Sequence, residues 1–139
     1  DIILFMRPDL MYLDPVNAAH DIFPLLRNQV DIVVPAWQSW GGTNDRFAFC
    51  TAAAAEIYAT RFDGIIEACL AMNGIHSESY LHAIITESGL RIGFTNLRAA
   101  RVRANGTVAD FDRGMLEQGL MDTIASPLAA NSTVLRPSC

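Results

Sequence analysis

An arginine, a proline and an aspartate (Arg7, Pro8 and Asp9) stand directly after an apolar run that is typical of a β-strand. In open α/β sheets, ligands bind beyond the carboxyl ends of the strands, so charged residues at this position are well placed for a site. A carboxylate held on the end of a rigid strand suits a hard divalent cation, which in turn bridges a diphosphate. Asp9 is therefore a candidate metal ligand. The alternative is that Asp9 is a turn residue and Arg7 is its ion-pair partner.

A second segment whose residues could bind a ligand or take part in a reaction runs from residue 37 to residue 45 and combines two tryptophans with two glycines. Gly41 and Gly42 permit a sharp turn and a close approach of the backbone to a ligand. Trp37 and Trp40 offer flat apolar faces on which the C–H groups of a sugar can pack, with an N–H at the edge. The alternative is a simple turn whose tryptophans belong to the core.

The same segment ends in an amide and a carboxylate, Asn44 and Asp45. Both side chains can bind hydroxyl groups, and Asp45 can accept a proton from one of them. Asp45 is therefore the candidate general base. The competing interpretation makes it a helix cap.

The order of these motifs resembles the nucleotide-sugar glycosyltransferases of the GT-A type. In that family a DxD-type motif ends a central strand and binds the metal and the diphosphate. Arg7-Pro8-Asp9 takes that place here, although Arg7 replaces the usual first aspartate and could meet the diphosphate directly. The segment from Trp40 to Asp45 is similar to the Trp-Gly-Gly-x-Asp-Asp stretch of the beta-1,4-galactosyltransferases, from which Asn44 departs. The chain also looks like glycosyltransferase-like proteins with a Trp-Gly-Gly-x-Asn-Asp-Arg-Phe core, over residues 1–112.

The resemblance implies transfer of a sugar from a nucleotide-sugar donor to a glycan or another hydroxyl acceptor, assisted by Mn²⁺ or Mg²⁺. Asp45 would be the catalytic base, and Asp9 would hold the metal. His76 is the candidate for a further metal contact, unless it is only a helix-entry residue. Arg103 could reach phosphate from a strand face, unless that face is merely solvated. The implied substrate contacts are Arg7, Trp37, Trp40, Gly41, Gly42, Asn44 and Arg103.

Two other functional classes use the same residues. A non-catalytic carbohydrate-binding or assembly module would need the tryptophans without metal chemistry. A metal-dependent phosphoester hydrolase would use Asp9, Asp14, Asp45 and His76, but these residues form neither a close carboxylate pair nor a His-x-His spacing.

The composition narrows the choice of partner. The formal charge of −5 argues against a nucleic-acid partner, because binding phosphates needs a basic surface. All ten basic side chains are arginine, which excludes a P-loop lysine and a Schiff-base lysine. The longest apolar run is too short to cross a bilayer, so we expect no membrane segment in this chain.

Hydrophobic patterning predicts a mixed α/β fold. Strands are expected near residues 1–6, 31–34, 46–50 and 90–94, and the first of them should be covered on both faces. Helices are expected after Thr51, across 62–70, after Ser77 and over 115–124. Residues 10–26 should form a loop with at most a short helical turn around Ala18 to Ile22. Asn105-Gly106 predicts a hairpin turn. The fold class is thus α/β, a mixed sheet with flanking helices, and the resemblance makes it a partial GT-A (Rossmann-like) fold.

The domain organisation follows from this pattern. Residues 1–125 should form the acceptor-side part of a GT-A-like catalytic domain, and residues 126–139 a poorly ordered tail. Because a domain rarely begins within its most buried strand, we expect a nucleotide-binding segment before Asp1. Asn105 and Asn131 each begin an Asn-x-Thr sequence, which matches the N-glycosylation pattern. Such a short pattern also arises by chance.

Overall fold

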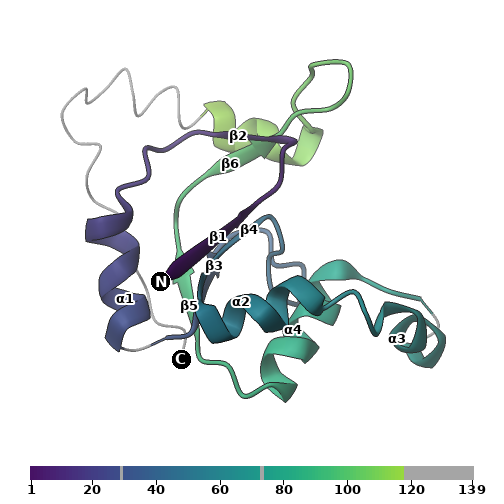
Figure 1. Cartoon of the computed structure of the whole chain (residues 1–139). Helices are drawn as coiled ribbons and strands as arrows, with labels where there is room; N and C mark the ends of the chain where they lie inside the picture. Colours follow the sequence, from purple (N-terminus) through teal and green to yellow (C-terminus); the bar gives the residue numbers. More distant parts are fainter. Residues whose placement is uncertain (29, 73, 118–139) are drawn as a thin grey trace.

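The structure is a computed structural model that describes residues 1–28, 30–72 and 74–117, and these form a mixed α/β fold (Figure 1). The strands are β1 (Ile2–Met6), β2 (Leu10–Tyr12), β3 (Ile32–Pro35), β4 (Phe47–Thr51), β5 (Ile92–Thr95) and β6 (Ala99–Arg101). The helices are η1 (Ala18–Ile22, a π-helix), α1 (Phe23–Asn28), α2 (Ala52–Thr60), α3 (Ile65–Met72), α4 (Ser77–Glu87) and η2 (Asp110–Asp112, a 3-10 helix).

Four strands form the main sheet, in the order β1-β4-β3-β5. β4 runs antiparallel to β1 and to β3, whereas β3 and β5 are parallel. β2 and β6 form a separate antiparallel pair. The predicted fold class, a mixed sheet with flanking helices, is therefore confirmed.

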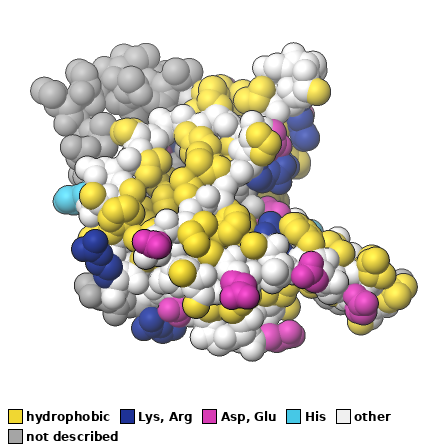
Figure 2. Space-filling model, in the orientation of Figure 1, with side chains coloured by type: hydrophobic (Ala, Val, Ile, Leu, Met, Phe, Trp, Pro, Cys, Tyr) yellow, Lys and Arg dark blue, Asp and Glu magenta, His cyan; other side chains and the backbone are white. Residues whose placement is uncertain are grey.

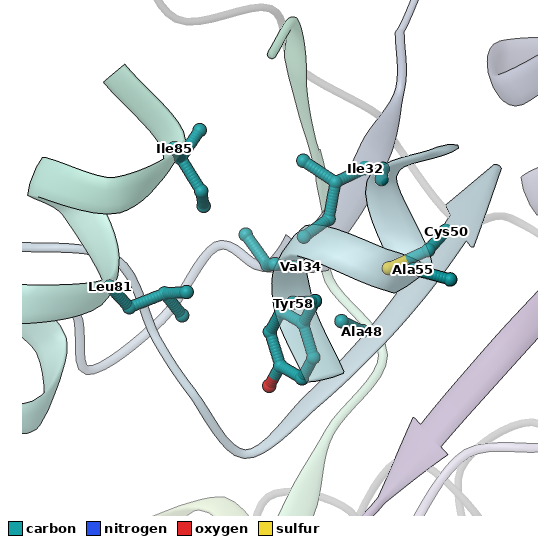
Figure 3. Packing of buried hydrophobic residues seen from close by; sticks show 9 residues of the cluster. Ile32, Val34, Ala48, Cys50, Ala55, Tyr58, Leu81 and Ile85 are labelled. Atoms are coloured by element: carbon teal, nitrogen blue, oxygen red, sulfur yellow. The ribbon is translucent and has the colours of Figure 1, made fainter. Parts of the chain in front are cut away.

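The hydrophobic core has two parts, one on each face of this sheet, because successive side chains of β3 point to opposite faces. Ile32 and Val34 point to the face covered by α2 and α4, where they pack with Tyr58, Leu81 and other buried side chains (Figure 3). Val33 points to the other face and packs on the side of η1 and α1. The sheet is thus held between two helical layers, which makes its edges rigid supports for a site.

β1 is an edge strand, which corrects the expectation that it is covered on both faces. Within the described residues it pairs with β4 alone, and Ile3, Leu4 and Met6 are 38, 42 and 51% exposed. Figure 2 shows hydrophobic side chains gathered across the middle of this face of the molecule. A continuous apolar run predicts a strand, but it does not establish that other layers cover it.

The predicted helices α2, α3 and α4 are all present, whereas α1 was not predicted. α2 begins after Thr51, whose hydroxyl accepts from the backbone N–H of Ala54, as predicted. α3 exists, but its predicted core face is exposed, with Ile66 at 70% and Leu70 at 80%. Figure 1 shows α3 projecting from the body of the protein. The pattern specified a helix and could not specify a partner for its apolar face.

The predicted loop from 10 to 26 is wrong in part, because it contains β2 and the beginning of α1, whereas η1 agrees with the short helical turn expected at Ala18–Ile22. Pro24 does not prevent α1, since the first turn of a helix tolerates proline. Residues 113–117 are helical, which agrees with the start of the helix predicted over 115–124. The remainder of that helix and the predicted tail lie outside the described residues. Across the described ranges, no helix is both long and apolar enough to span a membrane.

Candidate functional site

The predicted site segments meet at one edge of the main sheet. Met6, the last residue of β1, pairs with Phe47, the first residue of β4. β3 ends at the same edge, since its antiparallel register with β4 leads from Ile32 opposite Cys50 toward the start of β4. The segment after β1, which holds Arg7 and Asp9, and the loop between β3 and β4, which holds Asp45, therefore share this edge.

Arg7 and Asp9 form a bidentate ion pair. Arg7 Nε donates to Asp9 Oδ1 at 2.9 Å and Arg7 Nη2 donates to Oδ2 at 2.8 Å, and both side chains are about two-fifths exposed. The hydrogen bonds from Arg7 hold the pKa of Asp9 below its usual value. The backbone oxygen of Asp9 also accepts from Val102 N–H at 2.8 Å, which ties this turn to the residue after β6.

Asp45 lies beside this pair and is half-buried. Its carboxylate accepts no hydrogen bond from any described residue, while its backbone oxygen accepts from the Tyr58 hydroxyl at 3.3 Å. Hydrogen bonding to Asp9 raises the pKa of Arg7, and the charge of Asp45 raises it further. Asp45 is thus an anchored carboxylate that keeps its proton-accepting oxygens available.

A pocket of about 140 Å³ at this sheet edge is lined by Asp45 and by Arg7, the residue after β1, whereas Asp9 is not part of its lining. Its wall includes Arg61, whose guanidinium stacks over the rings of Tyr58 at 3.9 Å and Phe62 at 4.3 Å. Arg61 donates to the backbone oxygen of Tyr58 and forms no ion pair with a described carboxylate. The pocket is lined by Phe5, Met6, Arg7, Asp45, Arg46, Tyr58 and Arg61.

Burial raises the pKa of Tyr58 to about 12, so its hydroxyl stays protonated and donates to the loop that carries Asp45. Tyr58 therefore positions this loop and does not itself supply a base. Its ring at the same time supports the guanidinium of Arg61.

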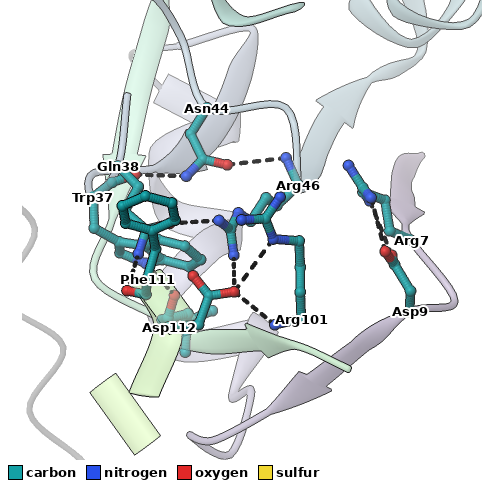
Figure 4. A network of polar contacts seen from close by, with 10 residues as sticks. Arg7, Asp9, Trp37, Gln38, Asn44, Arg46, Arg101, Phe111 and Asp112 are labelled. Carbon is teal, nitrogen blue, oxygen red and sulfur yellow. Dashed lines mark hydrogen bonds and ion pairs between the residues drawn. The ribbon is translucent and has the colours of Figure 1, made fainter. Parts of the chain in front are cut away.

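A buried ion-pair network supports the loop between β3 and β4 (Figure 4). Arg46 Nη1 donates to Asp112 Oδ2 at 2.8 Å, and the Arg46 and Asp112 side chains are 5% and 0% exposed. The same oxygen accepts from the backbone N–H of Arg101 at 2.8 Å, and Arg46 also donates to Gln38. Burial opposes ionisation of Asp112, but the hydrogen bonds from Arg46, Arg101 and Gln38 outweigh it and lower its pKa to about 2.

The tryptophans of this loop take different positions. Trp37 is part of its support, because its indole N–H donates to Leu97 O at 2.8 Å and its ring lies 5.0 Å from the Arg46 guanidinium. Trp40 is 52% exposed and adopts a positive φ of 48°. It packs edge-on against Phe111, which is 71% exposed, with ring centroids 5.5 Å apart. Trp40 and Phe111 thus form an exposed aromatic pair, and the sugar contact of Trp40 stays a prediction.

Three further predicted contact residues shape the loop. Gly41 has a φ of +81°, which favours glycine. A Cβ on Gly42 would lie 2.3 Å from the backbone of Glu78, so this glycine allows the loop to pack against the start of α4. Asn44 is buried, donates to Trp37 O and accepts from Arg46 N–H. Ligand contacts of Gly41, Gly42 and Asn44 stay predictions.

His76 and Arg103 do not line the pocket. His76 precedes α4, is half-exposed, and its ring contacts Ser79 Oγ at 3.2 Å and Glu78 at 3.5 Å. Arg103 is exposed in the predicted hairpin turn, where its backbone N–H donates to Thr107 O at 2.8 Å. Their metal and phosphate roles remain untested predictions.

The donor set that this edge offers a divalent cation includes the carboxylate of Asp9. Among the described residues, no group of three or more His, Cys, Asp or Glu side chains gathers in a way that could hold a metal ion. Asp9 fits the role of a single carboxylate ligand, which suffices for Mg²⁺ where substrate phosphates and waters supply the other oxygens. That role would compete with the two hydrogen bonds from Arg7.

Sequence reasoning missed Arg61, Tyr58 and Phe111 as parts of this site. A signal existed for Arg61, which stands three residues after Tyr58 on α2 and its C-terminal cap, a spacing that places side chains together. Phe111 and Asp112 gave no local signal, because Gln38 and Arg46, which bond to them, lie more than 60 residues away.

Comparison with protein-family models, with curated proteins and with solved structures finds no match for this chain. The resemblance to the glycosyltransferases therefore stays a prediction, and the function rests on the geometry of the site.

Proposed function

We propose that this chain supplies the acceptor-side part of a GT-A type glycosyltransferase that moves a sugar from a nucleotide-sugar donor to a hydroxyl acceptor. The observation that carries the proposal is the pocket at the sheet edge, which Asp45 and Arg7 both line, while Asp9 pairs with Arg7 outside the pocket lining. This is the edge at which open α/β sheets bind their ligands. A partial GT-A (Rossmann-like) fold belongs to the same proposal.

The pocket offers both functions that glycosyl transfer needs. Asp45 would accept the proton of the acceptor hydroxyl as its oxygen bonds to the anomeric carbon of the donor sugar. The bond from that carbon to the diphosphate would break, and the nucleoside diphosphate would leave with the electron pair. Arg7 and Arg61 would bind the diphosphate through charge-assisted hydrogen bonds. In a retaining reaction Asp45 would only orient the acceptor.

The exposed pair of Trp40 and Phe111 would bind the sugar by packing its C–H face. Asp9 would contribute one carboxylate to Mn²⁺ or Mg²⁺, an ion that supplies positive charge for the diphosphate when it is bound. His76 as a second ligand and Arg103 as a phosphate contact complete the proposed residue set.

A non-catalytic carbohydrate-binding module is the second candidate. The same exposed aromatic pair favours it, because stacking on Trp40 requires neither a base nor a metal. The two functions differ in whether the pocket binds a nucleoside diphosphate.

Calorimetric titration of the full chain with UDP and with GDP, with and without Mn²⁺, separates them. We expect heat of binding with at least one nucleotide, and a higher affinity when Mn²⁺ is present. Losing a charge-assisted hydrogen bond costs about 1.5–3 kcal/mol, so Arg61→Gln should weaken binding by about 10- to 100-fold. Arg91→Gln is the matched control, because Arg91 precedes β5 at the opposite sheet edge and pairs with Asp31.

Two outcomes contradict the transferase proposal. Absence of binding heat with both nucleotides, together with binding of free glycans that Trp40→Ala abolishes, would establish the module. Equal weakening by Arg61→Gln and Arg91→Gln would show that the nucleotide binds elsewhere.

A further inference from the structure

The turn between β6 and η2 carries an acceptor pattern that the proposed transferase site does not use. Asn105, Gly106 and Thr107 match the N-glycosylation sequence pattern and are all exposed. Figure 1 shows this loop standing away from the rest of the fold. A Cβ built on Gly106 would meet no atom within 4 Å, so the turn has open space around it.

The side chains of this turn are arranged around the amide oxygen of Asn105. Oδ1 accepts from the Thr107 backbone N–H at 3.0 Å and from the Thr107 hydroxyl at 2.8 Å. The amide nitrogen Nδ2 makes no hydrogen bond within the part of the chain that the structure describes. The reactive nitrogen is thus exposed, while the oxygen and the hydroxyl are already paired with each other.

The backbone of the turn is also held by hydrogen bonds that do not involve the Asn105 amide nitrogen. Arg103 N–H donates to Thr107 O at 2.8 Å, Gly106 N–H donates to Arg103 O at 2.8 Å, and Val102 bridges Val108. Gly106 has the positive φ, +80°, that the turn requires. A substituent on Nδ2 would therefore break no contact that maintains the fold.

We propose that Asn105 is a site of N-linked glycosylation. The donor class is an oligosaccharide linked to a lipid pyrophosphate. Nδ2 bonds to the anomeric carbon of the first sugar, the bond from that carbon to the pyrophosphate oxygen breaks, and the lipid pyrophosphate leaves with the electron pair. One proton of Nδ2 passes to a base of the transferring enzyme, and no group is oxidised or reduced.

The test is secretion of the full chain from a eukaryotic cell, followed by peptide mass spectrometry after amidase deglycosylation in heavy-oxygen water. We expect Asn105 to appear as labelled aspartate only when the amidase is added, and both Asn105→Gln and Thr107→Val to lose that amidase-dependent label. Thr107→Ser, which keeps the hydroxyl, should retain it. Urea unfolding of Thr107→Val should match the parent chain, which separates loss of the acceptor from loss of the fold.

A secreted chain in which Asn105 is unmodified overturns the proposal. Glycosylation of the second pattern, at Asn131 outside the described residues, in the same molecules would show that the transferring enzyme had reached the chain. Retention of the label in Thr107→Val would also contradict it, because the modification would then be independent of the pattern.

Discussion

Replacing Asp112 by asparagine should destabilise the fold far more than replacing its close sequence neighbour Asp110. Asp112 is fully buried and its Oδ2 lies 2.8 Å from Nη1 of Arg46, whose side chain is 5% exposed. Removing one partner of a buried ion pair leaves the other charge uncompensated, which costs about 3–5 kcal/mol. Asp110 is 86% exposed and pairs with the exposed Arg113, and such surface pairs contribute little.

Urea unfolding followed by circular dichroism measures the difference. With an m-value of about 2 kcal/mol/M, a loss of about 4 kcal/mol lowers the unfolding midpoint by about 2 M. Asp110→Asn provides the matched control, since it makes the same chemical change two residues away. If Asp112→Asn shifts the midpoint no further than Asp110→Asn, Asp112 does not hold the loop through a buried charge pair.

Two further predictions concern the same loop. The pKa of Asp112 is lowered from 3.8 to about 2 in the fold. The stabilisation that its charge provides is therefore present above about pH 4 and is lost as the pH falls toward 2. The urea unfolding midpoint should fall across this pH window, and the part of the fall that is due to Asp112 should be missing in Asp112→Asn. Gly42→Ala should lower the free energy of unfolding by about 3 kcal/mol, because its Cβ would lie 2.3 Å from the backbone of α4. Gly114→Ala is the control and should not destabilise the protein, because its Cβ would meet no atom within 4 Å. Equal urea unfolding midpoints for the two variants would refute the close approach at Gly42.

The sequence predicted those parts of the fold whose signals are local. The β-branched run at 32–34 and the Thr51 cap specify β3 and α2 because neighbouring residues determine a strand or a helix start. The segments of Asp9 and Asp45, each predicted to carry chemistry, lie at the same sheet edge in the fold, because both adjoin strand ends. The exposure of β1 and α3 escaped prediction, since the apolar pattern does not show whether a covering layer exists.

The supports of the site were beyond local reasoning. Arg46 and Asp112 are 66 residues apart, and only the folded chain joins them. Gly42 was predicted as a ligand contact, and its close approach proves to be to the backbone of α4. A glycine indicates that something comes near the backbone, but the sequence does not say whether that is a ligand or another part of the chain.

The most direct test of the transferase account is the turnover of Asp45→Asn. Nucleotide release from a nucleotide sugar is measured with a hydroxyl acceptor present, and donor affinity is measured by calorimetry on the same preparation, with Asp110→Asn as control. A general base contributes about 10²- to 10⁴-fold, so Asp45→Asn should lose at least about 100-fold in turnover while its donor affinity is unchanged. Parallel loss of turnover and donor affinity, or turnover equal to that of the control, would contradict the assignment of Asp45 as the base.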